Sequence, residues 1–357
     1  MRCFFSAPPM KNICLPILLA AAFPSFAVAQ TPGASAEETV SQLSHTLDAQ
    51  QKQLAALQQQ LAEIQAGKPQ AVSSAPATWD NSRPLSLLRS GNSYLNLSLI
   101  ADVAAGSSSQ KEVGTLQMGG HDPAQRGFTI QGVEAVFEGA VDNYFRAFSN
   151  VLYSLNTEGE SFFELEEAYA ETLALPFGLQ ARAGQFFTPF GRINGQHTHS
   201  WDFVDAPIVT SRFLGPDGLR NPGASLSWLT PTPFYSELTL GVQNSQGETA
   251  YSFRNEFGAD DGHGHADEIP FGRPSQETSV NGLGDLLYSA RYSASFDLSE
   301  TQTLLGGISG AWGPNSTGQN ARTQLYGADL YWKWKPADHH KGFPFVSFQS
   351  EILFRGY

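Results

Sequence analysis

The chain has 357 residues, enough for one large β domain or two domains of ordinary size. Its 34 Gly, 25 Phe, 11 Tyr and 6 Trp, beside only 15% charged residues, argue against a helical enzyme and favour many short strands joined by turns. The formal net charge of −13 argues against a nucleic acid partner.

Residues 1–29 have the pattern of a secretory signal peptide. Lys11 supplies the charge, residues 13–23 form the apolar stretch, and Ala27-Val28-Ala29 matches the A-x-A cleavage pattern. An apolar stretch this short does not span a bilayer, which takes about 20 residues. We therefore expect the segment to be removed on export. Met10 opens a better signal than Met1, so either residue can be the true start.

Both cysteines, Cys3 and Cys14, lie within this signal. The mature chain is therefore expected to contain no cysteine and no disulfide.

Residues 30–66 are expected to form a periplasmic segment with a helical coiled coil over 36–66. Apolar residues recur on a 3-4 spacing, at Val40, Leu43, Leu47, Leu54, Leu57, Leu61 and Ile64, and only Gln50 interrupts the seam. We expect a homotrimer through this coiled coil; the alternative is a single amphipathic helix packed on the mouth of the next domain. Residues 67–90, rich in Pro, Ser and Ala up to Pro84, are interpreted as a linker.

Residues 91–357 alternate between apolar and polar side chains with the period of β-strands. In one such stretch Tyr326, Leu330 and Trp332 share a face, and Asp329 and Lys333 lie on the other. Strands are expected near 93–105, 127–140, 144–153, 162–174, 179–187, 223–229, 235–243, 284–297, 301–312, 323–335 and 345–355.

The connections between these strands alternate between long loops and tight turns. A soluble β-sandwich also alternates apolar and polar residues, but it has no reason to sort its loops by length. Long external loops and short periplasmic turns are typical of a transmembrane β-barrel in the outer membrane. The predicted fold is therefore all-β: an antiparallel transmembrane barrel in contact with outer-membrane lipid.

Eleven strands would leave an unpaired, lipid-exposed edge, which a membrane does not tolerate. We therefore expect either a truncated chain or one strand that the pattern does not reveal.

The run RAGQFFTPFGRINGQHTHSWDFVDAPIVTSRFLGPDGLRN over 182–221 resembles a family of proteobacterial outer-membrane proteins related to the phosphate-selective porins O and P. The resemblance continues in SELTLGVQN, GLGDLLYSARYSASFDLSETQTLLGG and YGADLYWKWKP, so it covers most of 127–354. Members of this group are often labelled porins or zinc-regulated TonB-dependent outer-membrane receptors. The resemblance implies either a diffusion channel or a metal receptor with a plug domain.

The loop over 188–222 mixes aromatic and charged residues, which argues against disorder. It is expected either to fold into the lumen as a constriction or to be latched to the barrel wall by salt bridges. The candidate constriction residues are Arg192, His197, His199, Asp202, Asp205, Arg212, Asp217 and Arg220.

Further candidates for the lumen are Arg182, Arg291, Asp329, Lys333 and Lys335, with Arg146, Glu134, Glu164 and Glu166. Because carboxylates accompany the cations, the pattern does not favour anions.

No resident cofactor is expected, but zinc is a possible ligand at one stretch. Asp260, Asp261, His263, His265 and Asp267 lie in the 244–283 loop, and histidines with carboxylates suit zinc. The alternative is weak binding without a physiological role.

The leading expectation is a porin-like channel for passive diffusion of small solutes or ions. The alternatives are an outer-membrane zinc-binding or receptor protein, and an envelope-structural barrel tethered through its coiled coil. No local Ser, His and acid arrangement indicates an enzyme.

Overall fold

The structure is a computed structural model that describes residue 52 and residues 84–116, 119–156, 159–255 and 279–357. Its strands form one 12-stranded antiparallel sheet, and each strand pairs with its neighbours in sequence. The all-β prediction is confirmed. The strands are β1 (Leu85–Ser90), β2 (Ser93–Gly106), β3 (Gly127–Ala140), β4 (Phe145–Leu155), β5 (Ser161–Thr172), β6 (Leu179–Phe187), β7 (Arg220–Leu229), β8 (Tyr235–Gln243), β9 (Leu287–Ser299), β10 (Gln302–Pro314), β11 (Arg322–Trp334) and β12 (Val346–Gly356).

Helical structure among the described residues is limited to short segments within the connections. These are α2 (Ile208–Leu214) and the 3-10 turns η1 (Val113–Thr115), η2 (Pro176–Gly178), η3 (Thr198–Ser200) and η5 (Leu283–Asp285). Within the described part of the chain, no helix has both the length and the apolar character needed to cross a membrane.

The alternating pattern places apolar side chains on the exposed face of the sheet. Phe128, Phe163, Ile308 and Phe354 are all more than 60% exposed. The opposite face carries buried polar side chains, among them Glu134, Asn150 and Glu166 on β3–β5, Ser289 on β9 and Asp329 on β11. This distribution is the reverse of that in a soluble β protein, where the apolar face is turned inward.

The expected count of eleven strands is corrected to twelve. The eleven predicted strands match β2–β12, and β1 lies at 85–90, inside the stretch that was interpreted as a linker. The register of β1 on β2 shifts between Ser86 and Leu88, so a bulge breaks the alternation there. A pattern search with period 2 therefore does not recognise this strand.

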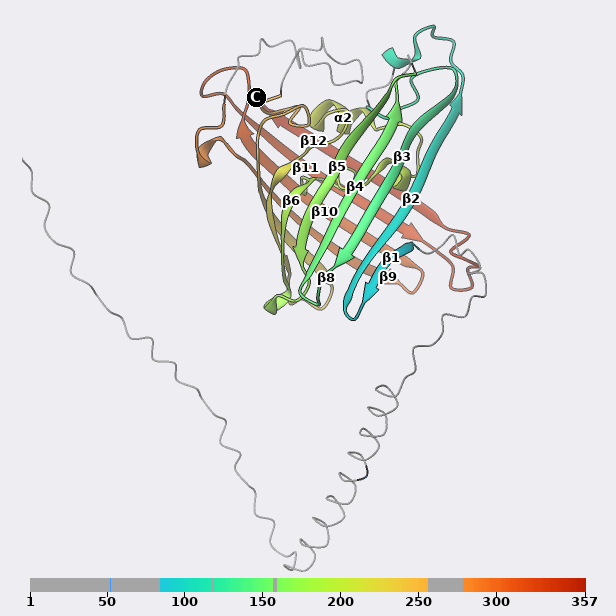
Figure 1. Cartoon of the computed structure of the whole chain (residues 1–357), viewed down its shortest axis with the longest axis vertical. Coiled ribbons are helices and arrows are strands. Elements are labelled where there is room, and N and C mark those ends of the chain that lie inside the picture. Colours follow the sequence, from blue (N-terminus) through green and yellow to red (C-terminus); the bar gives the residue numbers. More distant parts are fainter. Residues whose placement is uncertain (1–51, 53–83, 117–118, 157–158, 256–278) are drawn as a thin grey trace, which may run out of the picture. The chain divides into compact units, whose positions relative to one another are not determined.

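The longest connections lie at one end of the strands, as expected, but the sorting by length is not complete. Connections 107–126, 156–160, 188–219, 244–286 and 315–321 lie at one end, and 91–92, 141–144, 173–178, 230–234, 300–301 and 335–345 lie at the other, so 335–345 is longer than two of the connections opposite it. In Figure 1, β2–β5 lie in front of β10–β12, so the sheet is strongly curled. Among the described strands, β1 pairs with β2 and β12 with β11, and no β1–β12 pair is present.

Three predictions fall outside the described residues. These are the signal peptide at 1–29, the coiled coil at 36–66 and the candidate metal stretch Asp260, Asp261, His263, His265 and Asp267.

Candidate functional site

Residues 188–219, here called the inner connection, link β6 to β7 and fold back along the buried face of the sheet. The base is closed by a hydrogen bond from the Thr188 backbone N–H to the Leu219 carbonyl oxygen (2.8 Å). The buried Asn194 side chain ties the same two residues: Nδ2 donates to both carbonyl oxygens (2.9 Å each), and Oδ1 accepts from the Leu219 N–H (2.8 Å). These bonds make the connection a compact unit with its own shape.

One side of this unit packs on β9–β12, here called the packed wall. Phe190, Leu214 and Leu219 of the inner connection are at most 1% exposed. They form one hydrophobic cluster with Ala250 and Phe253 of the β8–β9 connection and with Leu287, Ala311, Leu325 and Leu353 of the strands. The molecule's main apolar core therefore lies inside the curl of the sheet, not on its outer face.

Backbone groups of the inner connection also compensate a carboxylate of the packed wall. The N–H groups of Arg192 and Ile193 donate to the two oxygens of Glu351 on β12 (3.2 and 3.4 Å). Gly191 has a φ of 62°, and a Cβ there would collide with Glu351, so only glycine fits this approach. The Arg192 guanidinium lies 4.0 Å from the centroid of the Tyr331 ring.

Arg291 and Asp329 form the central ion pair of the packed wall. Nη1 and Nη2 of Arg291 donate to the two Asp329 oxygens at 2.6 and 2.9 Å, and Nη1 also donates to Ser309 (2.9 Å). The Asp329 side chain is 1% exposed, so the bidentate pair satisfies a charge that is almost fully buried.

The other side of the inner connection faces a cluster of four carboxylates and one amide on β3–β5, here called the acidic wall. It consists of Glu134, Asn150, Glu164, Glu166 and Glu167. Asn150 of β4 pairs with Glu167, whereas Val151 pairs with Leu165, so Glu166 is the extra residue of a bulge. Such a bulge turns consecutive side chains toward the same face. Both Glu166 and Glu167 are accordingly buried on the inner face.

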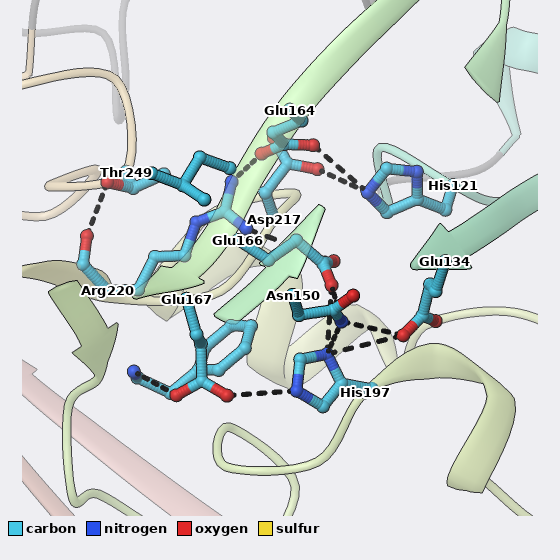
Figure 2. A network of polar contacts seen from close by, with 12 residues as sticks. His121, Glu134, Asn150, Glu164, Glu166, Glu167, His197, Asp217, Arg220 and Thr249 are labelled. Carbon is cyan, nitrogen blue, oxygen red and sulfur yellow. Dashed lines mark hydrogen bonds and ion pairs between the residues drawn. The ribbon is translucent and has the colours of Figure 1, made fainter. Parts of the chain in front are cut away.

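His197 of the inner connection lies between three of these glutamates (Figure 2). Its Nδ1 is 2.9 Å from Glu166 Oε2 and 3.9 Å from Glu134 Oε2, and its Nε2 is 2.9 Å from Glu167 Oε2. Burial lowers the pKa of the imidazole, but the hydrogen bonds with Glu166 and Glu167 outweigh burial and raise that pKa to about 10.

His199 and Asn150 complete this cluster. The His199 Nδ1 is 2.7 Å from Glu134 Oε1, and its ring is stacked on that of His197 with the centroids 5.7 Å apart. Asn150 is fully buried, and its Nδ2 lies 2.7 Å from Glu134 Oε2, 2.7 Å from Glu166 Oε2 and 3.1 Å from His197 Nδ1. One amide nitrogen thus stands at the point where three candidate ligand atoms converge.

A second cluster joins the inner connection to the β2–β3 connection. His121 Nε2 lies 3.5 Å from Glu164 Oε2 and 3.6 Å from Asp217 Oδ1. Arg220, the first residue of β7, forms an ion pair with the other oxygen of Glu164. Figure 2 shows Glu164 between the arginine and the histidine. A guanidinium therefore already compensates this carboxylate.

The residues predicted for a constriction are thus divided among several places. His197, His199, Asp217 and Arg220 lie at the acidic wall and Arg192 at the packed wall, whereas Asp202, Asp205 and Arg212 are exposed.

Of the other predicted lumen residues, Arg182 pairs with Glu171 (2.9 Å) and stacks on Tyr169. Lys333 lies 4.8 Å from the centroid of the Phe345 ring, and Lys335 is partly buried.

The inner connection leaves a cavity of about 250 Å³ beside β6–β9. Its strand residues are mostly polar: Gln180, Arg182, Phe186, Phe187, Ser225, Ser227, Glu237, Thr239 and Arg291. The inner connection therefore contacts the acidic wall and the packed wall, and the remaining space lies between it and β6–β9.

Sequence reasoning did not include His121, Asn150 or Glu167 in a site. In a regular strand, Glu167 would face away from Glu164 and Glu166. The bulge at Glu166 turns it toward the same face, and no local sequence signal reveals this bulge. His121 and Asn150 reach their partners from separate strands and connections, so their positions depend on the register of the whole sheet.

Comparison with known proteins gives one informative match. The chain is 34% identical over 251 residues to an uncharacterized protein of Aquifex aeolicus (strain VF5), and the match covers 66% of this chain and 48% of the relative. The chain thus spans about half the length of the curated relative that it matches. No family model matches the chain.

Proposed function

We propose that the chain forms an outer-membrane β-barrel through which small hydrophilic solutes or ions diffuse passively. The observation that carries this proposal is a polar cavity enclosed by a sheet whose exposed face is apolar. Lipid solvates such an outer face, and water fills such an interior. The longest connections, at one strand end, support the same orientation, with the short turns in the periplasm.

The proposal requires both edges of the sheet to be paired within the membrane. An open edge exposes backbone N–H and C=O groups, each of which costs several kcal/mol in lipid. The edges in question are β12 on one side and, on the other, β1 with the part of β2 beyond it. We infer that these two edges of the sheet pair with each other in the membrane and thereby close the barrel.

The inner connection acts in this proposal as the constriction. It packs against both the acidic wall and the packed wall, so solutes pass between it and β6–β9. Formation of a homotrimer rests on the heptads at 36–66, which lie outside the described residues, and it stays a prediction.

Conductance of the refolded full chain in planar bilayers tests the proposal. Ser227 lines the cavity and its neighbour Leu226 is 43% exposed on the outer face. We expect Ser227→Trp to reduce the single-channel conductance severalfold, because the indole occupies the route, and Leu226→Trp to leave it unchanged. Absence of channel events in several salts, or equal conductance of the two variants, would refute the proposal.

A further inference from the structure

We propose that Glu134, Glu166 and His197 bind a divalent transition-metal cation, with zinc as the representative ion, at the contact between the inner connection and the acidic wall. This inference goes beyond the channel. It depends only on the local packing of β3–β5 and the inner connection, not on closure of the barrel or on conductance.

The ligand geometry is the first argument. One ligand atom from each of Glu134, Glu166 and His197 lies within 4.8 Å of the other two, a separation that a single ion can bridge with bonds of about 2.0–2.2 Å after small movements. Imidazole nitrogen with carboxylate oxygen is a donor set that suits zinc and similar ions better than magnesium or calcium. All three side chains are nearly buried, with 2%, 4% and 15% exposure.

The tautomer of His197 is the second argument. A histidine that ligates a metal through one nitrogen usually donates its other N–H to a carboxylate, which fixes the ring. Here Nε2 is 2.9 Å from Glu167 Oε2 and Nδ1 is 2.9 Å from Glu166 Oε2, so a cation bound by Nδ1 and Glu166 would take the place of the proton between them. Glu167 is itself held by the Phe187 backbone N–H (3.3 Å), so the supporting carboxylate is also oriented.

The remaining oxygens of the two glutamates have their own partners. Glu134 Oε1 lies 2.7 Å from His199 Nδ1, and Glu166 Oε1 lies 3.9 Å from a nitrogen of Arg220. Glu134 is thus held through Oε1, and both glutamates present Oε2 to His197. This arrangement predisposes Oε2 of both glutamates to bind the same cation.

Asn150 supplies an independent indication. Its side chain is fully buried, and its Oδ1 accepts no hydrogen bond from any described residue. Nδ2 has only two hydrogens, yet three potential acceptors lie within 3.1 Å of it. Nitrogen and oxygen of an amide are assigned from the surrounding network. With the amide rotated, Oδ1 would point at the cation as a fourth ligand.

Other clusters carry this inference less well. The ligand atoms of His121, Glu164 and Asp217 have a similar spacing. The Arg220 guanidinium, however, already compensates the negative charge of Glu164 that would attract a cation to this group.

Zinc titration of the refolded full chain by calorimetry tests the proposal. The background is a His263→Ala/His265→Ala variant, which removes the histidines of the 244–283 loop as competing ligands. We expect one zinc ion per chain, with an affinity reduced at least about 100-fold by Glu166→Gln and about 10–100-fold by the positioning variant Glu167→Gln. Glu300→Gln is the matched control, because Glu300 is an exposed glutamate in a turn, and it should bind zinc like the background.

No zinc binding by the background, or equal affinity of the background and Glu166→Gln, would overturn the proposal. If Glu166→Gln does not fold, zinc X-ray absorption on the background still decides: scattering from an imidazole ligand is expected, and its absence overturns the site. Neither readout depends on channel activity, so failure of this site and failure of the proposed channel are distinguishable.

Discussion

The acidic wall and the packed wall hold the same connection by different means. On the packed wall, apolar side chains exclude water and each buried carboxylate has dedicated donors: Asp329 has Arg291, and Glu351 has two backbone N–H groups. On the acidic wall, Glu134, Glu166 and Glu167 share two histidines and an amide. Asp329 and Glu351 of the packed wall therefore have separate donors, whereas the carboxylates of the acidic wall share theirs, which leaves capacity there for a further cation.

This difference separates stability from function. A compensated, close-packed contact stabilises the fold and gains nothing from a ligand. A buried site with surplus carboxylates costs free energy until a cation arrives, and such conflicts concentrate at functional sites. Matched substitutions on the two walls are therefore expected to differ in their effect on stability and in their response to zinc.

The largest effect is expected from the apolar core of the packed wall. Phe190 is 1% exposed, and its ring packs against Gly327 on β11, where any Cβ would lie only 3.0 Å from the ring. Phe190→Ala should lower the free energy of unfolding by about 3–5 kcal/mol, because it creates a cavity that the strands cannot close. Urea unfolding of the refolded protein in lipid measures this change. Phe177→Ala is the control: Phe177 is 86% exposed in a turn, and its loss should cost less than about 0.5 kcal/mol. Similar losses for both would contradict a core inside the sheet.

Removing one carboxylate from each wall should have a smaller effect on the free energy of unfolding. The loss of stability should also differ between the two walls. Asp329→Asn leaves the Arg291 guanidinium poorly compensated and should destabilise the metal-free protein by about 2–3 kcal/mol. Glu134→Gln should cost less, about 1 kcal/mol in chelator, because an amide oxygen at this position still accepts a hydrogen bond from Asn150.

Unfolding in urea with and without zinc checks this contrast. Zinc should stabilise the wild type and Asp329→Asn, but not Glu134→Gln, since ligand binding to the folded state adds to its stability. Equal losses at the two positions in chelator would show that the two walls do not differ.

Much of the fold could be predicted because strands obey a short-range rule. Period 2 and the sorting of connections located β2–β12 to within a few residues. The misses, β1 and Glu167, share one cause: a bulge breaks the alternation at Ser86–Leu88 and at Glu166. Bulges depend on the partner strand, so a single strand's sequence does not report them.

The candidate site was less predictable than the fold. His197 and His199 stood out because a long loop rich in aromatic and charged residues is unusual in a compact domain. Asn150 did not stand out, since a lone asparagine in a strand looks like any other inward polar residue. Its role depends on Glu134 and Glu166, which reach it from the two adjacent strands.

The smallest effect concerns pH at a compensated carboxylate near the packed wall. Asp285 precedes β9, and its oxygens accept hydrogen bonds from the Asn281 backbone N–H (2.9 Å) and the Arg254 guanidinium (3.1 Å). The Asn281 N–H, aided by Arg254, lowers the pKa of Asp285 below its ordinary value of 3.8. Because the folded-state pKa is the lower one, the charge stabilises the protein above pH 3.8 and this contribution is lost as the pH falls through the folded pKa.

Thermal unfolding of the wild type and Asp285→Asn at pH 7 and at pH 2 tests this sign. The wild type should unfold at a slightly higher temperature at pH 7, and the difference should shrink at pH 2, because the carboxyl is then protonated in the unfolded state and loses its charge in the folded state as the pH falls through the lowered pKa. A difference that persists or grows at pH 2 would mean that Asp285 acts through shape, not charge. Because Asp285 has its own donors, this result should be the same with and without zinc. The contribution to stability of a carboxylate with dedicated donors depends on its own protonation, whereas that of a carboxylate in the acidic wall should depend on the shared cation.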